Sequence, residues 1–116
     1  MPLIKTQVSK NLSSDKKEEL AKELSAKCAE VLGKPESFVV SIVDDNSTIT
    51  FGGEIREFAY IELKSIGALG PVVNEELTIA ICDVVNDIID IDGDKVYIEF
   101  SDVPGAYWGW NNKTFR

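Results

Sequence analysis

Residues 15–35 read DKKEELAKELSAKCAEVLGKP, and this stretch sets the architecture of the first half of the chain. Apolar residues recur in it at helical spacing, with charged residues mostly between them: Leu20, Leu24, Cys28 and Val31. We therefore predict a helix from Asp15 to Leu32 that buries one face. Asp15 followed by Glu18 fits a capping box, although Ser14 is an alternative cap. Gly33 and then Pro35 are typical of a helix end.

Outside this stretch, the same reasoning predicts a second helix and several strands. The second helix is predicted from Pro71 to Ile89, because proline is favoured in a first turn and a broad apolar stripe follows it. Runs rich in β-branched and aromatic residues predict strands at 3–8, 38–43, 58–63 and 96–100. A shorter strand is predicted at 48–51, ended by Gly52 and Gly53.

The two halves of the chain match each other at an offset of 57 residues, which relates Leu3 to Tyr60 and Leu20 to Leu77. A duplicated β-α-β unit packs two helices on one face of a four-stranded sheet. We therefore predict one α+β, ferredoxin-like domain over residues 1–116, with pseudo-repeats of about 1–57 and 58–116. Alternation within the last strand leaves Tyr97 and Glu99 on the face without helices. That mixed face predicts a homo-oligomer.

Composition excludes several classes of function. Twelve basic against twenty acidic residues give a net charge of −8, which disfavours nucleic acid and anionic membrane surfaces as partners. The chain has no histidine, so catalytic triads and histidine-ligated metal sites are excluded. Its two cysteines, Cys28 and Cys82, are interpreted as reduced core thiols. The first residues do not match a signal peptide, so we expect a cytoplasmic protein, or one secreted by a non-classical route.

Two other motifs fail as ligand sites. With Asp90 as the first position of a calcium loop, Lys95 stands where the glycine is required and Ser101 where the closing glutamate is required. We therefore interpret the aspartates of 87–94 as a solvated loop and predict no metal. The stretch 67–70 lacks the lysine and hydroxyl of a phosphate-binding loop, so we interpret it as a turn.

Pro2 is the strongest candidate for chemistry. Removal of Met1, which is favoured before a small second residue, leaves Pro2 as a free secondary amine. Such an amine titrates near ~8 in water, and burial in an apolar pocket lowers its pKa toward neutrality. A base with a pKa near the working pH is suited to removing a proton from a carbon next to a carbonyl.

Several motifs occur together in one order: MPLI at 1–4, GKP at 33–35, FGG at 51–53, KSIG at 64–67, KVYI at 95–98 and GWNNKTF at 109–115. With these motifs the chain resembles the macrophage migration inhibitory factor family of the tautomerase superfamily, of which D-dopachrome tautomerase is a close relative. The resemblance covers essentially the whole chain. It implies a homotrimer with active sites at the subunit interfaces.

The resemblance also implies roles for individual residues. Pro2 corresponds to the catalytic base and Lys34 to the lysine that binds the substrate carboxylate. Ile66 corresponds to the residue whose backbone amide contacts the substrate, with Ser65 beside it. Tyr97 corresponds to a tyrosine contributed by a neighbouring subunit. The apolar lining positions fall on Phe38, Trp108, Trp110 and Phe115.

Two departures from the family pattern have consequences. Glu99 stands where the best-known members have asparagine, and a carboxylate there favours protonated Pro2 and repels anionic substrates. The paired cysteines of the vertebrate cytokine are absent from 58–61, so thiol oxidoreductase activity is not expected.

The resemblance implies a cofactor-independent keto–enol tautomerase of small aromatic α-keto acids, such as phenylpyruvate and dopachrome-type compounds. Two alternatives stay open. One is a secreted, cytokine-like ligand of a cell-surface receptor whose pocket is vestigial, and the other is a purely structural trimer.

Overall fold

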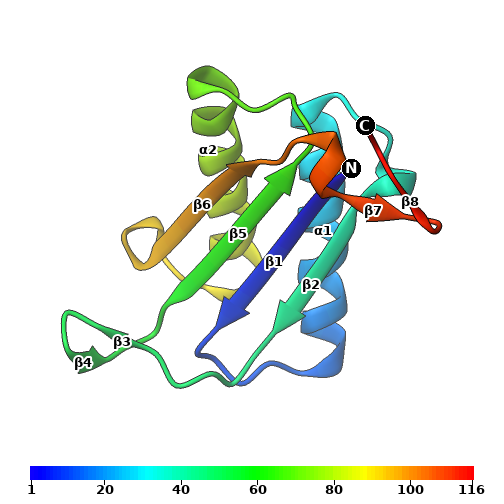
Figure 1. Ribbon diagram of the computed structural model, residues 1–116. Helices are drawn as coiled ribbons and strands as arrows, with labels where there is room; N and C mark the ends of the chain where they lie inside the picture. Colours follow the sequence, from blue (N-terminus) through cyan, green and yellow to red (C-terminus); the bar gives the residue numbers. More distant parts are fainter.

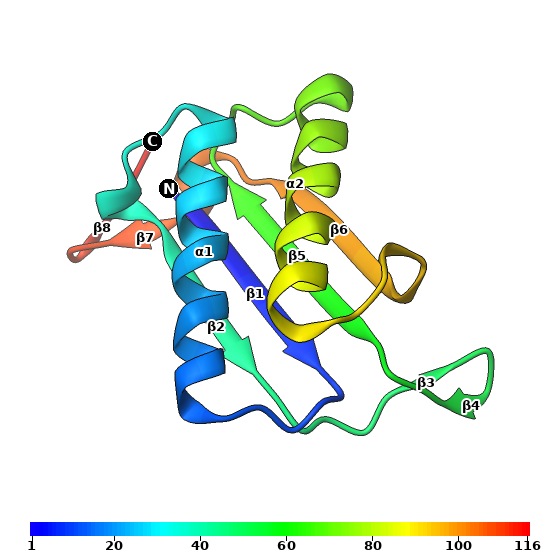
Figure 2. The same ribbon diagram turned by 180° about the vertical axis from the view of Figure 1, so that it is seen from behind.

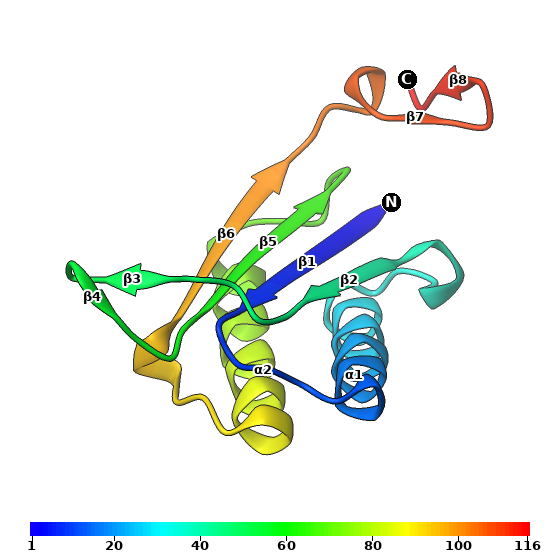
Figure 3. The same cartoon turned by 90° about the horizontal axis from the view of Figure 1, so that it is seen from below.

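The computed structural model describes residues 1–116 and places two helices on one face of a four-stranded sheet (Figures 1 and 2). The helices are α1 (Ser14–Leu32) and α2 (Pro71–Ile89). The strands lie side by side in the order β2 (Val40–Asp44), β1 (Pro2–Val8), β5 (Ala59–Ser65) and β6 (Val96–Asp102). Seen from below, the two layers separate clearly, with both helices beneath the sheet (Figure 3). The predicted α+β fold is confirmed.

The register of the sheet follows from its two central strands. β1 and β5 pair antiparallel over their full lengths, from Pro2 opposite Ser65 to Val8 opposite Ala59. β2 is parallel to β1, and β6 is parallel to β5. The sequence offset of 57 residues also separates the first residues of the helices, Ser14 and Pro71.

The hydrophobic core lies between the helices and the inner face of the sheet. It is built from residues that alternate along the strands and recur at helical spacing: Ile4, Val8, Ala59, Ile61 and Leu63 from the strands, and Leu20, Leu24, Cys28, Leu77, Ile81 and Val85 from the helices. All of these are fully buried. Burial raises the pKa of the Cys28 thiol to about 12, so this thiol stays protonated and packs as an apolar group.

Small elements lie at opposite ends of the molecule. A hairpin of β3 (Thr50–Phe51) and β4 (Glu54–Ile55) extends from one end, and a hairpin of β7 (Gly109–Trp110) and β8 (Lys113–Thr114) lies at the other (Figures 1 and 3). Three short 3₁₀ turns precede β2, β6 and β7: Glu36–Phe38, Gly93–Lys95 and Gly105–Tyr107.

Several predicted boundaries were wrong by a few residues. Neither Asp15 nor Ser14 caps α1; the extended residue Ser13 does, its hydroxyl accepting the backbone N–H of Lys16 at 3.2 Å. Phe38 does not begin a strand, because its N–H bonds to the carbonyl of Pro35 in a 3₁₀ turn.

The strands also differ from their predicted ranges because pairing sets their ends. The strand predicted at 58–63 lies at Ala59–Ser65, and the last strand continues from Phe100 to Asp102. The short strand predicted at 48–51 covers only Thr50–Phe51, and Gly52 and Gly53 form the turn to β4, a strand that was not predicted. Both glycines have positive φ, a conformation that favours glycine.

The face of the sheet without helices is mixed, as the alternation predicted. Tyr97 is 57% exposed at one edge, on β6, and Val40 is 54% exposed at the other edge, on β2. Charged residues occupy the centre, where Lys5 lies opposite Glu62 and Glu62 opposite Glu99. No helix in the structure has both the length and the apolar composition needed to cross a membrane.

Candidate active site

The end of α1 brings Lys34 to the end of the sheet at which Pro2 begins β1. Gly33 adopts the left-handed conformation, φ 66°, and its N–H bonds back to the carbonyl of Glu30. The N–H of Lys34 bonds to the carbonyl of Ala29 at 3.1 Å, which completes a Schellman cap. Pro35 then prevents the helix from continuing. The GKP motif therefore ends the helix and fixes the backbone of Lys34.

The C-terminal hairpin delivers two aromatic rings to the same place. Asn111 and Asn112 connect β7 and β8, with φ of 53° and 68°, as a type I′ turn requires. Asparagine tolerates this conformation better than other non-glycine residues. The rings of Trp110 and Phe115 stack with their centres 6.0 Å apart, and Phe38 meets Trp110 edge-on at 6.3 Å.

Gly105 holds this hairpin close to the preceding turn. The N–H of Phe115 donates to its carbonyl at 3.0 Å. A Cβ atom at position 105 would collide with the carbonyl oxygen of Phe115, so only glycine permits this approach. The sequence analysis missed Gly105, although the Pro104-Gly105 pair is a recognisable turn signal.

The segment after β5 forms the third wall. The N–H of Gly67 donates to the carboxylate of Asp102 at 2.9 Å, and the N–H of Val103 donates to the carbonyl of Ser65 at 2.8 Å. These bonds fix the backbone on both sides of Ile66.

Together these elements enclose a cavity of about 370 Å³ lined by Met1, Lys34, Phe38, Ile66, Trp110 and Phe115. A second hollow of about 230 Å³ adjoins it and shares three of these residues, adding Pro2, Ser37, Val39, Val40 and Trp108. Sizes of this order are typical of small-molecule sites. The walls are mainly apolar, with one cationic side chain, so the cavity suits a small anion with an aromatic or apolar body.

Electrostatics in the cavity centre on Lys34 and the N-terminal amine. The ammonium of Lys34 donates to the carbonyl of Ile66 at 2.6 Å, which leaves two of its three N–H groups for other acceptors. Burial lowers the pKa of the Met1 amine below its usual value, and the charge and hydrogen bond of Lys34 lower it further. An amine at this place is therefore enriched in its neutral, basic form.

The structure thus brings together seven of the ten site residues named from the sequence: Pro2, Lys34, Ile66, Phe38, Trp108, Trp110 and Phe115. Ser65 lies opposite Pro2 in the ladder, but its side chain is fully buried and lines neither hollow. Its hydroxyl has no hydrogen-bond partner in the chain. Sequence reasoning missed Ser37, Val39 and Val40, for which no motif gave a signal.

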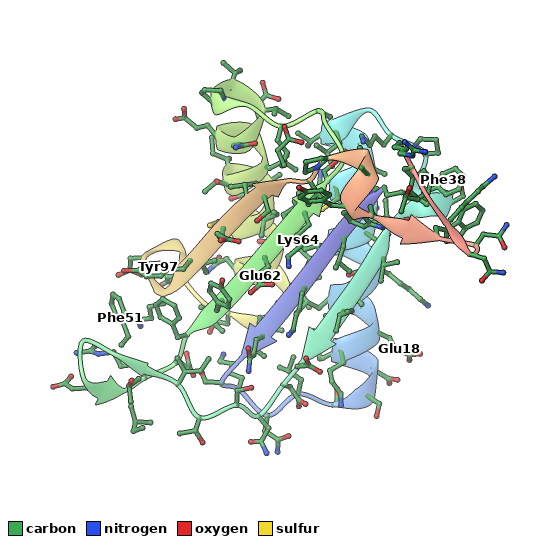
Figure 4. The ribbon with its side chains drawn as sticks, viewed as in Figure 1. Glu18, Phe38, Phe51, Glu62, Lys64 and Tyr97 are labelled. Atoms are coloured by element: carbon green, nitrogen blue, oxygen red, sulfur yellow. The ribbon has the colours of Figure 1, made fainter.

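Tyr97 and Glu99 lie outside the cavity of their own chain. Tyr97 is level with Gln7 and Tyr60, at the end of the sheet away from Pro2. Figure 4 shows Tyr97 and Phe38 at opposite ends of the molecule. Glu99 lies on the same face as Tyr97 and accepts a hydrogen bond from the hydroxyl of Ser101 at 3.2 Å. Burial raises the pKa of Tyr60, and the carboxylates of Glu62 and Glu99 raise it further. Neither residue lines either hollow of its own chain.

A larger hollow of about 490 Å³ lies between the outer surfaces of α1 and α2. Four carboxylates and one lysine line it, together with Ile79, Ala80 and Val84. It holds no amine beside a lysine, so we take the smaller cavity at the N-terminus as the candidate site.

Comparisons with known proteins show which family the chain is similar to. The model of the macrophage migration inhibitory factor family matches residues 1–116. A solved structure of a macrophage migration inhibitory factor homologue from Prochlorococcus marinus is 39% identical, with a TM-score of 0.93 over 98% of this chain and 99% of that one. A similar protein from Entamoeba histolytica is 32% identical, with a TM-score of 0.92 over 98% of both chains. Among curated proteins, the macrophage migration inhibitory factor homologue of Brugia malayi is 36% identical over 94 residues, 81% of this chain and 82% of that protein.

The dependence of the amine on Lys34 is directly testable. Lys34→Met removes a positive charge and a hydrogen bond that disfavour the ammonium form, so the pKa of the N-terminal amine should rise. It should stay below its usual value, because burial still acts. The pH dependence of amine acylation, followed by mass spectrometry, measures this pKa. Lys22→Met, which removes an exposed charge on α1, is the control and should leave the pKa unchanged. An equal effect of both variants would contradict this assignment.

Proposed function

The chain belongs to the macrophage migration inhibitory factor family, and from that premise we propose that it is a keto–enol tautomerase of small aromatic α-keto acids such as phenylpyruvate. The observation that carries the proposal is the apolar cavity in which the N-terminus lies beside Lys34. We further propose that the protein acts in the cytoplasm and needs no cofactor.

In the proposed mechanism, Pro2 becomes the N-terminal residue after Met1 is removed. Its ring nitrogen, which is an amide nitrogen while Met1 is present, then becomes a free amine. The Pro2 side chain is fully buried at the start of β1. The neutral amine removes a proton from the carbon next to the substrate carbonyl, and the carbonyl oxygen becomes the enol oxygen. The protonated amine then delivers this proton to the enolate oxygen, which forms the enol. No atom is gained or lost, so the reaction is an isomerisation.

Substrate orientation depends on the two groups that face the amine. The free N–H groups of Lys34 bind the carboxylate, and the backbone amide of Ile66 contacts the substrate. Phe38, Trp110 and Phe115 surround the aromatic body of the substrate. This arrangement places the carbon that loses its proton near the amine of Pro2. Substrate binding therefore also orients the reacting atoms.

We propose that the site is completed by a homotrimer. Tyr97 and Val40 are exposed at opposite edges of the sheet, so one edge can contact the other edge of the next copy. Such a head-to-tail contact closes into a ring of three when each copy is rotated by about 120° relative to the last. Because Val40 borders the hollow beside Pro2, this contact would bring Tyr97 to the neighbour's cavity. There its hydroxyl polarises the substrate.

The alternative function is a ligand for a cell-surface receptor. The names of the relatives favour it, and the cavity would then be secondary. Receptor binding that survives chemical blocking of Pro2 would support this alternative, whereas tautomerase activity lost on blocking supports the enzyme.

The assembly gives the first prediction from this proposal. Multi-angle light scattering at micromolar concentration should report about three times the subunit mass of 12.8 kDa. A replacement of exposed Val40 by Asp should shift the protein toward smaller species, because it places a charge at the contacting edge. Val72→Asp, at an exposed position on α2, is the control. A stable monomer of the parent chain would contradict both the trimer and the shared site.

The second prediction concerns the base. Pro2→Gly keeps a free amine but loses the ring and the secondary nitrogen, and it should lower kcat/KM for phenylpyruvate enolisation by roughly 100-fold or more. Protein that retains Met1 should be nearly inactive, because its proline nitrogen is an amide. Pro71→Gly, at the exposed start of α2, is the matched control and should leave the rate unchanged. Turnover by Pro2→Gly at the parental rate would show that Pro2 is not the base.

The third prediction concerns Glu99, which reaches a cavity only in the proposed trimer. A carboxylate within about 4–6 Å of an amine raises its pKa, and one unit changes the population of free amine roughly tenfold. Glu99→Gln should therefore lower the pKa at which the pH–rate profile gains activity, and lower KM for anionic substrates. Glu23→Gln on α1 should change neither quantity. If Glu99→Gln also changes neither, Glu99 faces solvent in the assembly.

A further inference from the structure

Three aromatic rings form a closed cluster at the end of the sheet away from Pro2. Phe51 and Phe58 stack with their centres 4.8 Å apart. The ring of Tyr97 stands nearly perpendicular to both, at 5.7 Å from Phe51 and 5.2 Å from Phe58. These separations lie in the range of about 4.5–7 Å in which edge-to-face pairs are favourable. Figure 4 shows Phe51, on the projecting hairpin, directed toward Tyr97.

The cluster cannot act on the cavity of its own chain. Pro2 is level with Ser65, and Ser65 is level with Asp102, five residues further along β6 than Tyr97. At about 3.3 Å per residue, this places Tyr97 roughly 17 Å from Pro2 along the strand direction. Any role in the reaction must therefore be played in a neighbouring copy.

Tyr97 on its own is poorly restrained for such a role. It lies on β6, an edge strand, and its side chain is 57% exposed. Its ring packs against the rings of Phe51 and Phe58, and Tyr60 lies opposite it in the ladder. A side chain that must place a hydroxyl within hydrogen-bond distance of a substrate needs its ring held by packing.

We propose that Phe51 is a positioning residue, which fixes the ring of Tyr97 so that its hydroxyl meets the substrate bound in the neighbouring subunit. This inference rests on the proposed tautomerase function and names a determinant that lies in neither hollow around Pro2. Strand β3 then supports the active site, because the tight turn at Gly52 and Gly53 presents Phe51 to Tyr97.

Phe51 is distinguished from Phe58 by its place in the fold. Phe58 is only 4% exposed and lies directly before the central strand β5, so it also supports the sheet. Phe51 is half-buried and belongs to a two-residue strand that pairs only with β4. A substitution at Phe51 can therefore disturb Tyr97 without disturbing the core.

The test is a double-mutant cycle between Phe51 and Tyr97, made in the full chain with Met1 removed. The variants are Phe51→Leu, Tyr97→Phe and the double variant, each assayed for kcat and KM with phenylpyruvate. Phe51→Leu should lower kcat about tenfold and change KM less, because the hydroxyl acts on the reacting carbonyl. It should have no further effect in the Tyr97→Phe background, because the hydroxyl it positions is then absent. Phe51→Tyr, which keeps the ring, should restore most of the rate.

Ile55→Ala is the matched control. Ile55 is 72% exposed on the same hairpin and makes no ring contact with Tyr97, so its loss should leave kcat at the parental value. Light scattering and thermal unfolding report whether each variant assembles and folds. If Phe51→Leu fails to assemble, Phe51→Met takes its place in the cycle.

The outcomes separate this inference from the proposed function. An inactive parent, or a Tyr97→Phe variant with full activity, overturns the role of Tyr97 and this inference with it. The inference alone is overturned if the parent is active and Tyr97→Phe is impaired, but Phe51→Leu keeps the parental kcat. The same holds if the effects of Phe51→Leu and Tyr97→Phe on kcat are additive, or if Ile55→Ala lowers kcat as much as Phe51→Leu. Non-additive loss with rescue by Phe51→Tyr supports it.

Discussion

The antiparallel ladder between β1 and β5 is the constraint on which the rest of the structure depends. It joins the two halves of the chain and sets Pro2 opposite Ser65 at one end of the sheet. Because side chains alternate with a period of two, a slip of one residue would move Ile4 and Leu63 out of the core. The same slip would separate Pro2 from Ile66, which follows Ser65 directly. Stability and site geometry therefore require one register.

Lys34 links this ladder to the helix layer. The helix cap fixes its backbone, and its ammonium donates to the carbonyl of Ile66 at the end of β5. The chain as a whole has a net charge of −8, but the one charged side chain that lines this mainly apolar cavity is the cation of Lys34. A charge next to apolar walls interacts more strongly with other charges than it would in water, since the effective dielectric constant is lower. One lysine can therefore both attract an anion and lower the pKa of the neighbouring amine.

The sequence predicted those features that local chemistry determines. Gly33 and Pro71 mark the end of α1 and the start of α2 because a left-handed cap and a first-turn proline have local causes. The ends of the strands were predicted less well, since Ser65 and Asp102 are in strands only because they pair with each other. The C-terminal hairpin was not predicted because Asn111-Asn112 lacks the glycine that usually signals a type I′ turn.

The candidate site divides in the same way. Lys34 and the aromatic lining residues were identified from the resemblance, and the cavity gathers them within one chain. Alternation placed Tyr97 and Glu99 on the correct face, but periodicity carries no information on their distance from Pro2. That distance depends on the register between β5 and β6, which only the folded structure shows.

In the proposed trimer, a cavity at one end of the sheet and a tyrosine at the other make assembly part of the chemistry. The single chain holds an amine, a cation and apolar walls at one end of the sheet, and Tyr97 on the edge strand β6 lies at the other end. The proposed head-to-tail contact would cover the exposed apolar edge positions and would also supply the Tyr97 hydroxyl. Residues such as Val40 and Phe51 then serve both packing and reaction. Substitutions there can alter rate without touching the substrate, because the geometry of the site is the geometry of the interface.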